Sequence, residues 1–470
     1  NTGTHSLSSV TDFAMPSDGK VRATLSHPAK NETRSRSDVG IRTSFVKKTR
    51  FKKTTFKRQR RGLSFKLEGW SYTHGGPVHD VFILSAVRTP IGKFGGSLVS
   101  MTAADMGVVA AEGALQRAGV QPEQVEETIF GNARQAGGGP NPARQISIRS
   151  GVPQEVPAYT VNKACASGVK SIALGYQEIA VGNLECVLAG GTESMSRLPY
   201  YLEGARWGYR MGKQEVVDGM YRDGFFCPLA KMVMGETAEV LAEQYKISRE
   251  EQDQFALCSQ TRAAAAIAAG RFDDEIVPVT IEGKKGATVF ARDEHPFEGA
   301  SMEKLAKLAP VFSKTGTITA GNSSGITDGA AAVVLGSEEF VKKNNLKPLA
   351  RIMAVTSAGV DPRIMGIGPV PALRKMEQKH KLKPADFDVV ELNEAFAAQV
   401  LACDRDLHFD RSKLNVNGGA IALGHPIGCT GTRITVTLLH EMLKRKAKRG
   451  VATLCVSGGM GMALAIENVS

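Results

Sequence analysis

Three reactive side chains of this chain stand among glycines and other small residues. Cys165 lies in the run Val161-Asn-Lys-Ala-Cys-Ala-Ser-Gly, His425 lies in Asn417-Gly-Gly-Ala-Ile-Ala-Leu-Gly-His-Pro-Ile-Gly, and Cys455 opens Cys-Val-Ser-Gly-Gly-Met-Gly. Glycine costs stability inside a strand or helix, but it lets backbone approach a ligand closely. The two cysteines and the histidine therefore indicate a site for thiol-based acyl chemistry rather than three core side chains.

Thioester exchange is the reaction that these residue types support. A cysteine thiolate is both a nucleophile and a good leaving group, so acyl transfer through it needs no ATP. Cys165 falls between a predicted strand and a predicted helix, where the positive end of the helix dipole favours a thiolate. His425 stands between Gly424 and Pro426. An imidazole with a pKa near neutrality could take the thiol proton there and then polarise a thioester carbonyl.

Strands and helices alternate in the sequence that must position Cys165. Short apolar runs predict strands, and longer apolar segments predict helices, the first of them stopped by Gly119; the strands are 81–87, 125–130, 158–161 and 185–189, and the helices are 103–118 and 168–181. This alternation favours a largely parallel sheet covered on both faces. Ligands gather at the carboxyl ends of parallel strands, where Cys165 is placed.

The same order of elements returns near the C-terminus. Segments 350–355, 387–392 and 452–455 repeat the strand pattern, and Asn415-Val-Asn417 stands before its glycine cluster as Val161-Asn162 stands before Cys165. The period is far too long for a solenoid and indicates an internal duplication. Two similar halves would bring the Cys165 turn and the His425 turn face to face.

Residues from about 195 to about 325 interrupt the alternation between the two halves. Helices are predicted at 236–245 and 249–269, and this part also contains Trp207 and many methionines. We expect an inserted, lid-like helical region here.

Composition limits the class of protein. The 470 residues are 42% hydrophobic, which is enough for two or three domains with cores of their own. The sequence lacks an apolar run of about eighteen residues, so we expect no membrane association. Its seven cysteines are scattered without CxxC spacing, which favours reduced thiols in a reducing compartment and no metal site.

The positive charge is concentrated at the N-terminus. Residues 1–66 contain 16 Lys and Arg against 4 Asp and Glu, and this surplus equals the formal net charge of +12. We expect residues 1–77 to be a disordered basic extension, either a targeting segment or residues read from upstream of the true start. The neutral remainder offers no basic face, so we expect no nucleic-acid partner. The predicted location is cytoplasmic, or the mitochondrial matrix if residues 1–66 are a genuine leader.

Seven blocks in a fixed order resemble the thiolase family. They are Arg88-Thr-Pro-Ile-Gly-Lys-Phe, the Cys165 run, Ala189-Gly-Gly-Thr-Glu-Ser-Met, Thr319-Ala-Gly-Asn-Ser-Ser-Gly, Asn393-Glu-Ala-Phe, the His425 run and the Cys455 run. The resemblance covers residues 78–470. It implies a thiolase-like α/β fold in which two mixed-sheet halves, 78–347 and 348–470, form a layered αβαβα core around the inserted region.

The resemblance also implies an activity and a role for each reactive residue. The activity is the reversible, ping-pong condensation of two acetyl-CoA molecules to acetoacetyl-CoA and CoA. Cys165 would be the acylated nucleophile, His425 its base, and Cys455 the acid/base at the α-carbon of the second substrate. Asn393 would hold a water that faces the enolate oxygen together with His425.

Further residues are implied to bind the substrate. The backbone N–H groups of Cys165 and Ser457, beside Gly458, would form a second oxyanion hole. The residues implied to contact coenzyme A are Ser324, Ala320, Gly321 and Met234. Coenzyme A thioesters would be substrates, with no separate cofactor, and the protein would be a homodimer or homotetramer.

Three other classes of protein fit these residues less well. β-Ketoacyl synthases share the fold but pair their cysteine with two histidines, or with a histidine and an asparagine, and the Cys455 block argues against them. A non-catalytic thiolase-like lipid carrier or scaffold would be expected to lose Cys455 or His425, and this chain keeps both residues. A dinucleotide-binding dehydrogenase would need the motif GxGxxG after the first strand, and this sequence does not have it there.

The sequence leaves two alternatives for the length of the acyl chain in the substrate, one for each branch of the family. The run around Cys165 is more similar to the short-chain branch than to the medium- and long-chain 3-ketoacyl-CoA thiolases of fatty-acid β-oxidation. Val233 stands where many relatives have His, and Phe297 stands near the position of a common Arg. The first departure could change which acyl chain fits, and the second could weaken a nucleotide contact.

Overall fold

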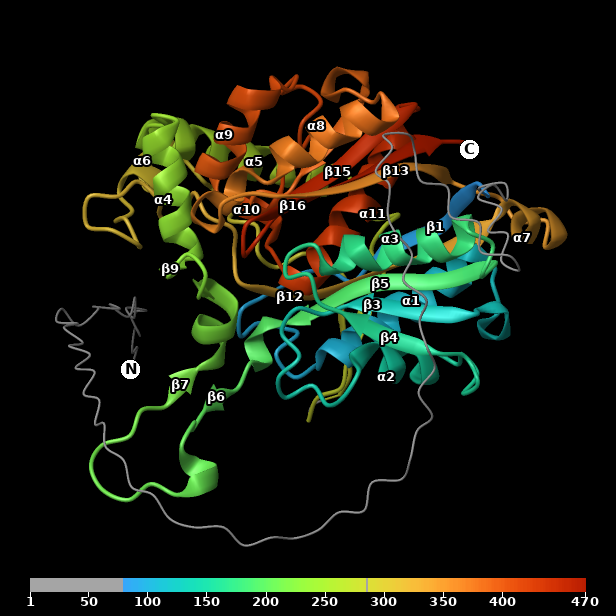
Figure 1. The fold of residues 1–470 in the computed structure, drawn as a ribbon, viewed down its shortest axis with the longest axis horizontal. Coiled ribbons are helices and arrows are strands. Elements are labelled where there is room, and N and C mark those ends of the chain that lie inside the picture. Colours follow the sequence, from blue (N-terminus) through green and yellow to red (C-terminus); the bar gives the residue numbers. More distant parts are fainter. Residues whose placement is uncertain (1–78, 285) are drawn as a thin grey trace, which may run out of the picture. The chain divides into compact units, whose positions relative to one another are not determined.

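A mixed β-sheet is the framework on which the functional residues are mounted (Figure 1). The computed structural model describes residues 79–284 and 286–470, so the prediction of a disordered extension at 1–77 lies outside the described residues. In this part of the chain ten strands belong to the sheet, nine of them in the order β14 (Val389–Leu392), β15 (Arg449–Val456), β16 (Met460–Asn468), β13 (Ala350–Gly359), β1 (Val81–Arg88), β12 (Thr327–Ser337), β5 (Cys186–Ser194), β3 (Glu127–Gly131) and β4 (Ala158–Val161), with β2 (Gly92–Lys93) paired to β12.

The central strands of the sheet run antiparallel. Only the outer pairs β14–β15, β3–β4 and β3–β5 are parallel within the described residues. The prediction of a largely parallel sheet was therefore wrong, whereas the mixed sheet implied by the family resemblance is confirmed. Neither β12 nor β16 was predicted from the sequence, because β12 is rich in alanine and glycine and β16 contains only one β-branched residue, Ile466. Both strands pair antiparallel with their neighbours and occupy the middle of the sheet.

Helices lie above, between and below the two halves of the sheet (Figure 1). α3 (Ser167–Ala180) and α11 (Ile427–Arg445) form the middle layer and contact each other. The other helices are α1 (Ala103–Ala118), α2 (Pro142–Arg149), α4 (Met234–Gln244), α5 (Arg249–Ala268), α6 (Met302–Ala306), α7 (Glu338–Lys343), α8 (Pro369–His380), α9 (Ala397–Leu407) and α10 (Ala420–Leu423). α1 and α2 cover the N-terminal half of the sheet, and α8 and α9 cover the C-terminal half.

Hydrophobic clusters on both faces of the strands hold these layers together. Val187 and Ala189 of β5 face the middle helices, while Leu188 between them packs with α1. On β16, Leu464 faces the middle layer and Ala463 faces the outer helices α8 and α9. Because both faces of these strands are buried, their sequences read as continuous apolar runs rather than as alternation.

Several predicted boundaries agree closely with the structure. The helix at 103–118 and the strand at 158–161 have the observed bounds, and Gly119 ends α1 with a φ of 67°. The strand predicted at 185–189 instead continues through Gly190 and Gly191 to Ser194. Leu414, directly before the segment 415–417, makes a single parallel bridge to Val390 of β14.

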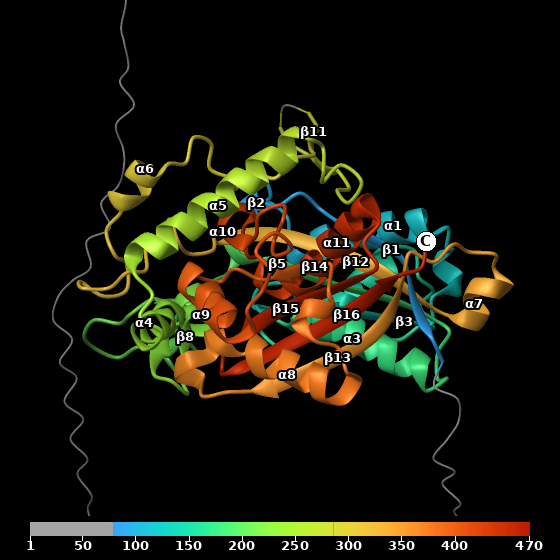
Figure 2. The ribbon, with the colours of Figure 1, turned by 90° about the horizontal axis from the view of Figure 1, so that it is seen from above.

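Residues between β5 and β12 form helices and three small hairpins. The hairpins pair β6 (Tyr200–Tyr201) with β7 (Val217–Asp218), β8 (Phe226–Cys227) with β9 (Met232–Val233), and β10 (Val279–Ile281) with β11 (Thr288–Phe290). α5 is the longest helix of this region and α6 packs beside it (Figure 2). No helix among the described residues is long and apolar enough to cross a membrane.

Candidate active site

Cys165 projects from a tight turn between β4 and α3. Ala164, directly before it, has a φ of 46°, a left-handed conformation that costs a non-glycine residue roughly 1 kcal/mol or more. Asn162 holds this conformation, since its Oδ1 accepts the Ala164 N–H at 2.9 Å. Ser167 holds it as well, by donating its hydroxyl to the Ala164 carbonyl at 2.6 Å and accepting the Lys163 N–H at 2.9 Å. The turn therefore presents Cys165 in one fixed orientation.

His425 is held just before α11 with one ring nitrogen engaged. Its Nδ1 lies 2.6 Å from the Thr430 hydroxyl oxygen, and that hydroxyl donates its proton to the Pro426 carbonyl at 2.9 Å. A hydroxyl has one proton, so Thr430 can only accept from Nδ1–H. This assignment leaves the lone pair of the neutral ring on Nε2. The backbone N–H of His425 donates to the Gly325 carbonyl at 3.1 Å.

Glycines bring the two middle helices into backbone contact beneath these side chains. A Cβ on Gly191 of β5 would lie 2.4 Å from the Gly428 carbonyl oxygen and 3.0 Å from the Gly168 Cα. A Cβ on Gly168 would lie 2.7 Å from the Thr432 nitrogen, and one on Gly428 would lie 2.7 Å from the Ala133 nitrogen. Side chains at these positions would separate α3 from α11. Glycine here sets the approach of the Cys165 turn to the His425 turn.

Cys455 lies at the end of β15, beside the hairpin that leads into β16. Gly458 and Gly459 form this hairpin with φ values of 85° and 84°, and a Cβ on Gly459 would lie 2.3 Å from the Val360 carbonyl. The backbone N–H of Ser457 lies close enough to the Cys165 sulfur to act on its pKa. The structure thus brings Cys165, Cys455 and the Ser457–Gly458 turn together.

Asn393 follows β14 and is almost fully buried. Its backbone N–H donates to Thr453, but neither its side-chain oxygen nor its side-chain nitrogen has a hydrogen-bond partner among the described residues. An unpaired buried amide costs about 1–3 kcal/mol. Such a group suits a ligand or water oxygen, as the sequence analysis predicted for Asn393.

Residues predicted to contact coenzyme A lie on two segments. Ser324 donates its backbone N–H to the Ala395 carbonyl at 3.0 Å, which places the 319–325 turn against the loop that begins at Asn393. Met234 packs beside the cluster that contains Cys455. Gly321 lies against Leu305, and Ala320 is exposed.

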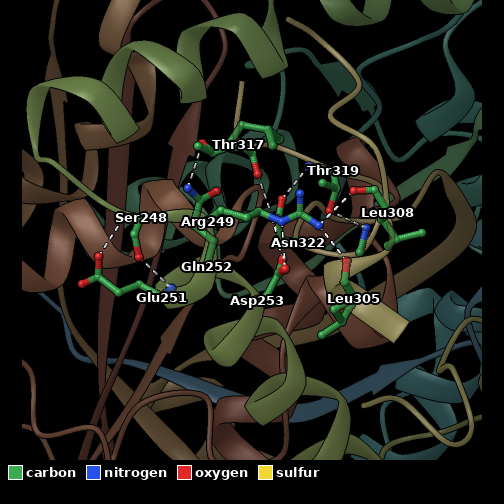
Figure 3. A network of polar contacts seen from close by, with 12 residues as sticks. Ser248, Arg249, Glu251, Gln252, Asp253, Leu305, Leu308, Thr317, Thr319 and Asn322 are labelled. Atoms are coloured by element: carbon green, nitrogen blue, oxygen red, sulfur yellow. Dashed lines mark hydrogen bonds and ion pairs between the residues drawn. The ribbon is translucent and has the colours of Figure 1, made fainter. Parts of the chain in front are cut away.

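Polar contacts from α5 anchor the 319–325 turn (Figure 3). Asn322 donates its side-chain N–H to Asp253 Oδ1 at 3.0 Å, and its own Oδ1 accepts the Thr319 N–H at 2.8 Å. Arg249 of the same helix bonds to Asp253 at 2.8 Å and reaches the Leu305 carbonyl at 2.6 Å. The inserted helices thus support the proposed coenzyme A turn from outside.

Burial keeps the reactive groups neutral. It raises the pKa of the Cys165 thiol, although the Ser457 N–H and the charge of Arg134 oppose this shift. Burial, followed by the nearby Cys165, raises the pKa of Cys455 well above its usual value. Burial lowers the pKa of His425 to about 3, assisted by Arg433 and Arg134. The expected near-neutral pKa of His425 was wrong, because burial depends on packing that the sequence alone does not show.

Two neighbours of the site were missed in the sequence analysis. Thr430 lies five residues beyond His425, in the first turn of α11, and this spacing gives no pairing signal in the sequence. Arg134 follows β3, and its guanidinium donates to the Gly224 carbonyl at 3.0 Å. Its charge acts on both Cys165 and His425, but no local spacing links it to them.

The doubled α/β fold, with a cysteine and a histidine before its two middle helices, defines the class as a thiolase-like protein. Two family models match nearly all of the described body: "Thiolase, N-terminal domain" over residues 81–339 and "Thiolase, C-terminal domain" over residues 346–468. The chain belongs to the thiolase family.

Curated relatives and solved structures extend the comparison. The acetyl-CoA acetyltransferase of Cupriavidus necator is 52% identical over 389 residues, which are 83% of this chain and 99% of that protein. That of Escherichia coli is 51% identical over 389 residues, with the same two shares. The crystal structure of the Bacillus anthracis acetyl-CoA acetyltransferase has a TM-score of 0.83 at 48% identity, covering 84% of this chain and all of that one. Human mitochondrial 3-ketoacyl-CoA thiolase has a TM-score of 0.81 at 46% identity and the same coverage.

Proposed function

We propose that this protein is an acetyl-CoA acetyltransferase that condenses two acetyl-CoA molecules to acetoacetyl-CoA and CoA, or runs the reverse thiolysis. The observation that carries the proposal is that Cys165 lies close enough to Cys455 to act on the pKa of Cys455, while Cys165 packs against the cluster that contains Ile427, two residues beyond His425. The free lone pair on His425 Nε2 supports its role as the base. The curated relatives with this printed name, at about half identity over almost their whole length, support the same activity.

Acylation comes first in this mechanism. His425 Nε2 takes the Cys165 proton as the sulfur attacks the thioester carbonyl carbon, so charge separates only when substrate is in place. The developing oxyanion accepts hydrogen bonds from the backbone N–H groups of Cys165 and Ser457. The carbon–sulfur bond to CoA then breaks, CoA takes the proton from His425, and the acetyl group stays on Cys165.

Condensation follows on the acetyl-enzyme. Cys455 first gives its proton to His425, and its thiolate then removes a proton from the α-carbon of a second acetyl-CoA, so that the enolate oxygen faces Asn393 and the protonated His425. The unpaired amide of Asn393 supports this assignment, because a developing negative charge needs donors already in position. The carbanion attacks the acetyl carbonyl on Cys165, acetoacetyl-CoA forms, and His425 gives its proton to the released Cys165 sulfur, while Cys455 keeps the proton taken from the substrate.

A covalent intermediate gives the direct test. Intact mass after mixing with acetyl-CoA should rise by one acetyl group, and peptide mapping should place it on Cys165. Cys165→Ser should show no rise. An acetyl group on Cys455 would reverse the two roles, and acetyl transfer that survives in Cys165→Ser would overturn the proposal.

A medium- or long-chain 3-ketoacyl-CoA thiolase is the second candidate, favoured by the similarity to the human mitochondrial 3-ketoacyl-CoA thiolase. Val233 is buried directly before α4. Because many relatives have a histidine at this position, the valine adds apolar surface at the predicted pocket. One or two methylenes give roughly 1–3 kcal/mol of discrimination. The run around Cys165 is more similar to the short-chain branch, and this limited discrimination does not outweigh it. Thiolysis of acetoacetyl-CoA should therefore exceed that of longer 3-ketoacyl-CoA substrates, with measurable activity on slightly longer chains. A kcat/KM that rises steadily from C4 to C16 would support the second candidate. Val233→His should narrow the range of chains if Val233 lines the pocket, and an unchanged range would show that it does not.

The assembly and location belong to the same proposal. The β6–β7 segment extends away from the sheet (Figure 1), and it leaves Trp207 86% and Met211 91% exposed. Exposed apolar side chains on one projecting segment support a homodimer or homotetramer. Light scattering of the wild type and of Trp207→Ser would test this. The proposed location is cytoplasmic, with the mitochondrial matrix as the alternative, and fractionation of cells that express the full chain would decide between them.

A further inference from the structure

Glu193 is a buried carboxylate that the proposed reaction does not use. It lies on β5 with no exposed surface, and four N–H groups donate to it. These donors are Asn132 Nδ2 at 2.6 Å, the Ala133 nitrogen at 3.2 Å, the Arg134 nitrogen at 3.1 Å and the Gly428 nitrogen at 2.7 Å. Burial raises the pKa of Glu193 to about 7, while Arg134 and the backbone donors oppose the shift. A protonated carboxyl would find no acceptor among these four groups, so the arrangement suits the carboxylate.

One of these contacts caps the helix that follows His425. Gly428 lies in the first turn of α11, and the preceding Pro426 supplies no side-chain cap. The Glu193 carboxylate accepts the free backbone N–H and places a negative charge at the positive end of this helix. The His425 turn is therefore tied to β5 by a charge-assisted hydrogen bond.

The other contacts of Glu193 lead to the Cys165 turn. The Ala133 carbonyl accepts the side-chain N–H of Asn162 at 3.0 Å, and Asn162 Oδ1 accepts the Ala164 N–H at 2.9 Å. Ala164 is the strained residue directly before Cys165. A continuous path of hydrogen bonds thus runs from the His425 helix through one carboxylate to the nucleophile turn.

Electrostatics alone does not explain a carboxylate at this place. The negative charge of Glu193 raises the pKa of Cys165 and so works against the thiolate that attacks the substrate. A role limited to tuning the thiol would favour a neutral or positive group. The benefit of Glu193 must therefore come from the geometry that its four hydrogen bonds impose.

We propose that Glu193 is a positioning residue that fixes the separation of Cys165 and His425 for proton transfer and attack. This inference rests on the proposed function, in which these two side chains react together. Both oxygens of Glu193 accept two N–H donors each, so a glutamine of the same shape would direct its NH₂ group at two donors.

Two measurements on Glu193→Gln separate positioning from charge tuning. The single-turnover acylation rate should fall by about tenfold to hundredfold, with the KM for acetyl-CoA changed by less than about twofold, because a small misplacement acts on the reacting geometry. Iodoacetamide alkylation of Cys165, followed by peptide mass, should become faster at a given pH, because a negative charge near the thiol is lost. A more reactive thiol in a slower enzyme is the expected pair of results.

Glu193→Asp keeps the negative charge and shortens the side chain. This variant replaces Glu193→Gln in the test if the glutamine variant does not fold. Its acylation should also slow, whereas the pH midpoint of Cys165 alkylation should stay near that of the wild type. The control is Glu441→Gln, a buried carboxylate near the other end of α11 that binds Arg271 and Asn417. This control should lose stability and keep its acylation rate.

Either of two outcomes would overturn the inference. One is acylation in folded Glu193→Gln within about threefold of the wild type. The other is a change of acylation and alkylation in the same direction, which would assign Glu193 a purely electrostatic role. Failure of the proposed function would look different, since it would appear as acetyl transfer that persists in Cys165→Ser.

Discussion

Thr430→Val should slow acylation of Cys165 while leaving the fold intact. Valine replaces the Thr430 hydroxyl with a methyl group of similar size, at a position with no exposed surface. The change removes the acceptor that lies 2.6 Å from His425 Nδ1. His425 is only 8% exposed, so water has little access to its Nδ1–H after the acceptor is removed. The ring would lose the contact that fixes its tautomer and orientation.

The size of the effect follows from the charge on His425 during attack. In the resting enzyme the Nδ1–H bond joins two neutral groups and is worth about 1 kcal/mol. Once Nε2 has taken the thiol proton, the same bond has a cationic donor and is worth about 1.5–3 kcal/mol. The bond is therefore stronger at the transition state than in the resting enzyme by about 0.5–2 kcal/mol, and its loss should lower the single-turnover acylation rate by roughly 2- to 30-fold. The lost hydroxyl bond to Pro426 should cost about 0.5–1.5 kcal/mol of stability.

Rapid mixing with acetyl-CoA, followed by acid quench and intact mass, measures this rate directly. Thr430→Ser keeps the hydroxyl and should retain acylation within about threefold of the wild type. A Thr430→Val enzyme as fast as the wild type would show that the Nδ1 contact does not matter to the reaction. If serine is as slow as valine, packing by the threonine methyl group is the cause, and the tautomer argument fails.

Three more predictions follow from the structure. Arg88→Met leaves Glu275 and Asp293 buried without their partner and should lower the free energy of unfolding by about 3–5 kcal/mol in denaturant titrations. Arg351→Met removes two partly exposed ion pairs, with Asp80 and Glu467, and should cost about 2 kcal/mol or less. Gly428→Ala should destabilise the protein by about 1–3 kcal/mol and slow acylation, because its Cβ would lie 2.7 Å from backbone atoms; Gly138→Ala, whose nearest atom is 3.4 Å away, should do neither. Because burial lowers the pKa of His425 to about 3 from 6.5, stability should be unaffected above pH 6.5 and fall as the pH drops toward 3; the loss should be smaller in His425→Gln, and a flat acid limb in the wild type would contradict the assignment.

Helix boundaries could be predicted from the sequence where neighbouring residues form the turn or the cap. Gly119 ends α1 because its positive φ suits the helix C-cap, and the Ser248–Glu251 capping box begins α5 at the predicted residue. The motif blocks likewise predicted one site for Cys165, His425 and Cys455, although these residues stand up to 290 positions apart in a chain of 470 residues.

Features that depend on long-range packing were not accessible in the same way. β12 is rich in alanine, and only its position between β1 and β5 makes it a buried strand. Glu193 was within a quoted motif block, yet its contact with Gly428 crosses 235 residues. The low pKa of His425 likewise reflects burial by several distant segments rather than any neighbour in the sequence.

Close helix packing and the resting state of the proposed site have one physical origin. The glycines at 168, 191 and 428 let the two middle helices meet through their backbones and bury the side chains before them. Burial opposes any charged form, so it keeps the proton on the Cys165 sulfur and off the His425 ring. A thiolate–imidazolium pair then gains stability only when a thioester carbonyl occupies the backbone N–H donors and shares the developing negative charge. Under the proposed mechanism, the same packing that positions Cys165 also delays its ionisation until the correct substrate is bound, which protects the thiol from reaction with other electrophiles.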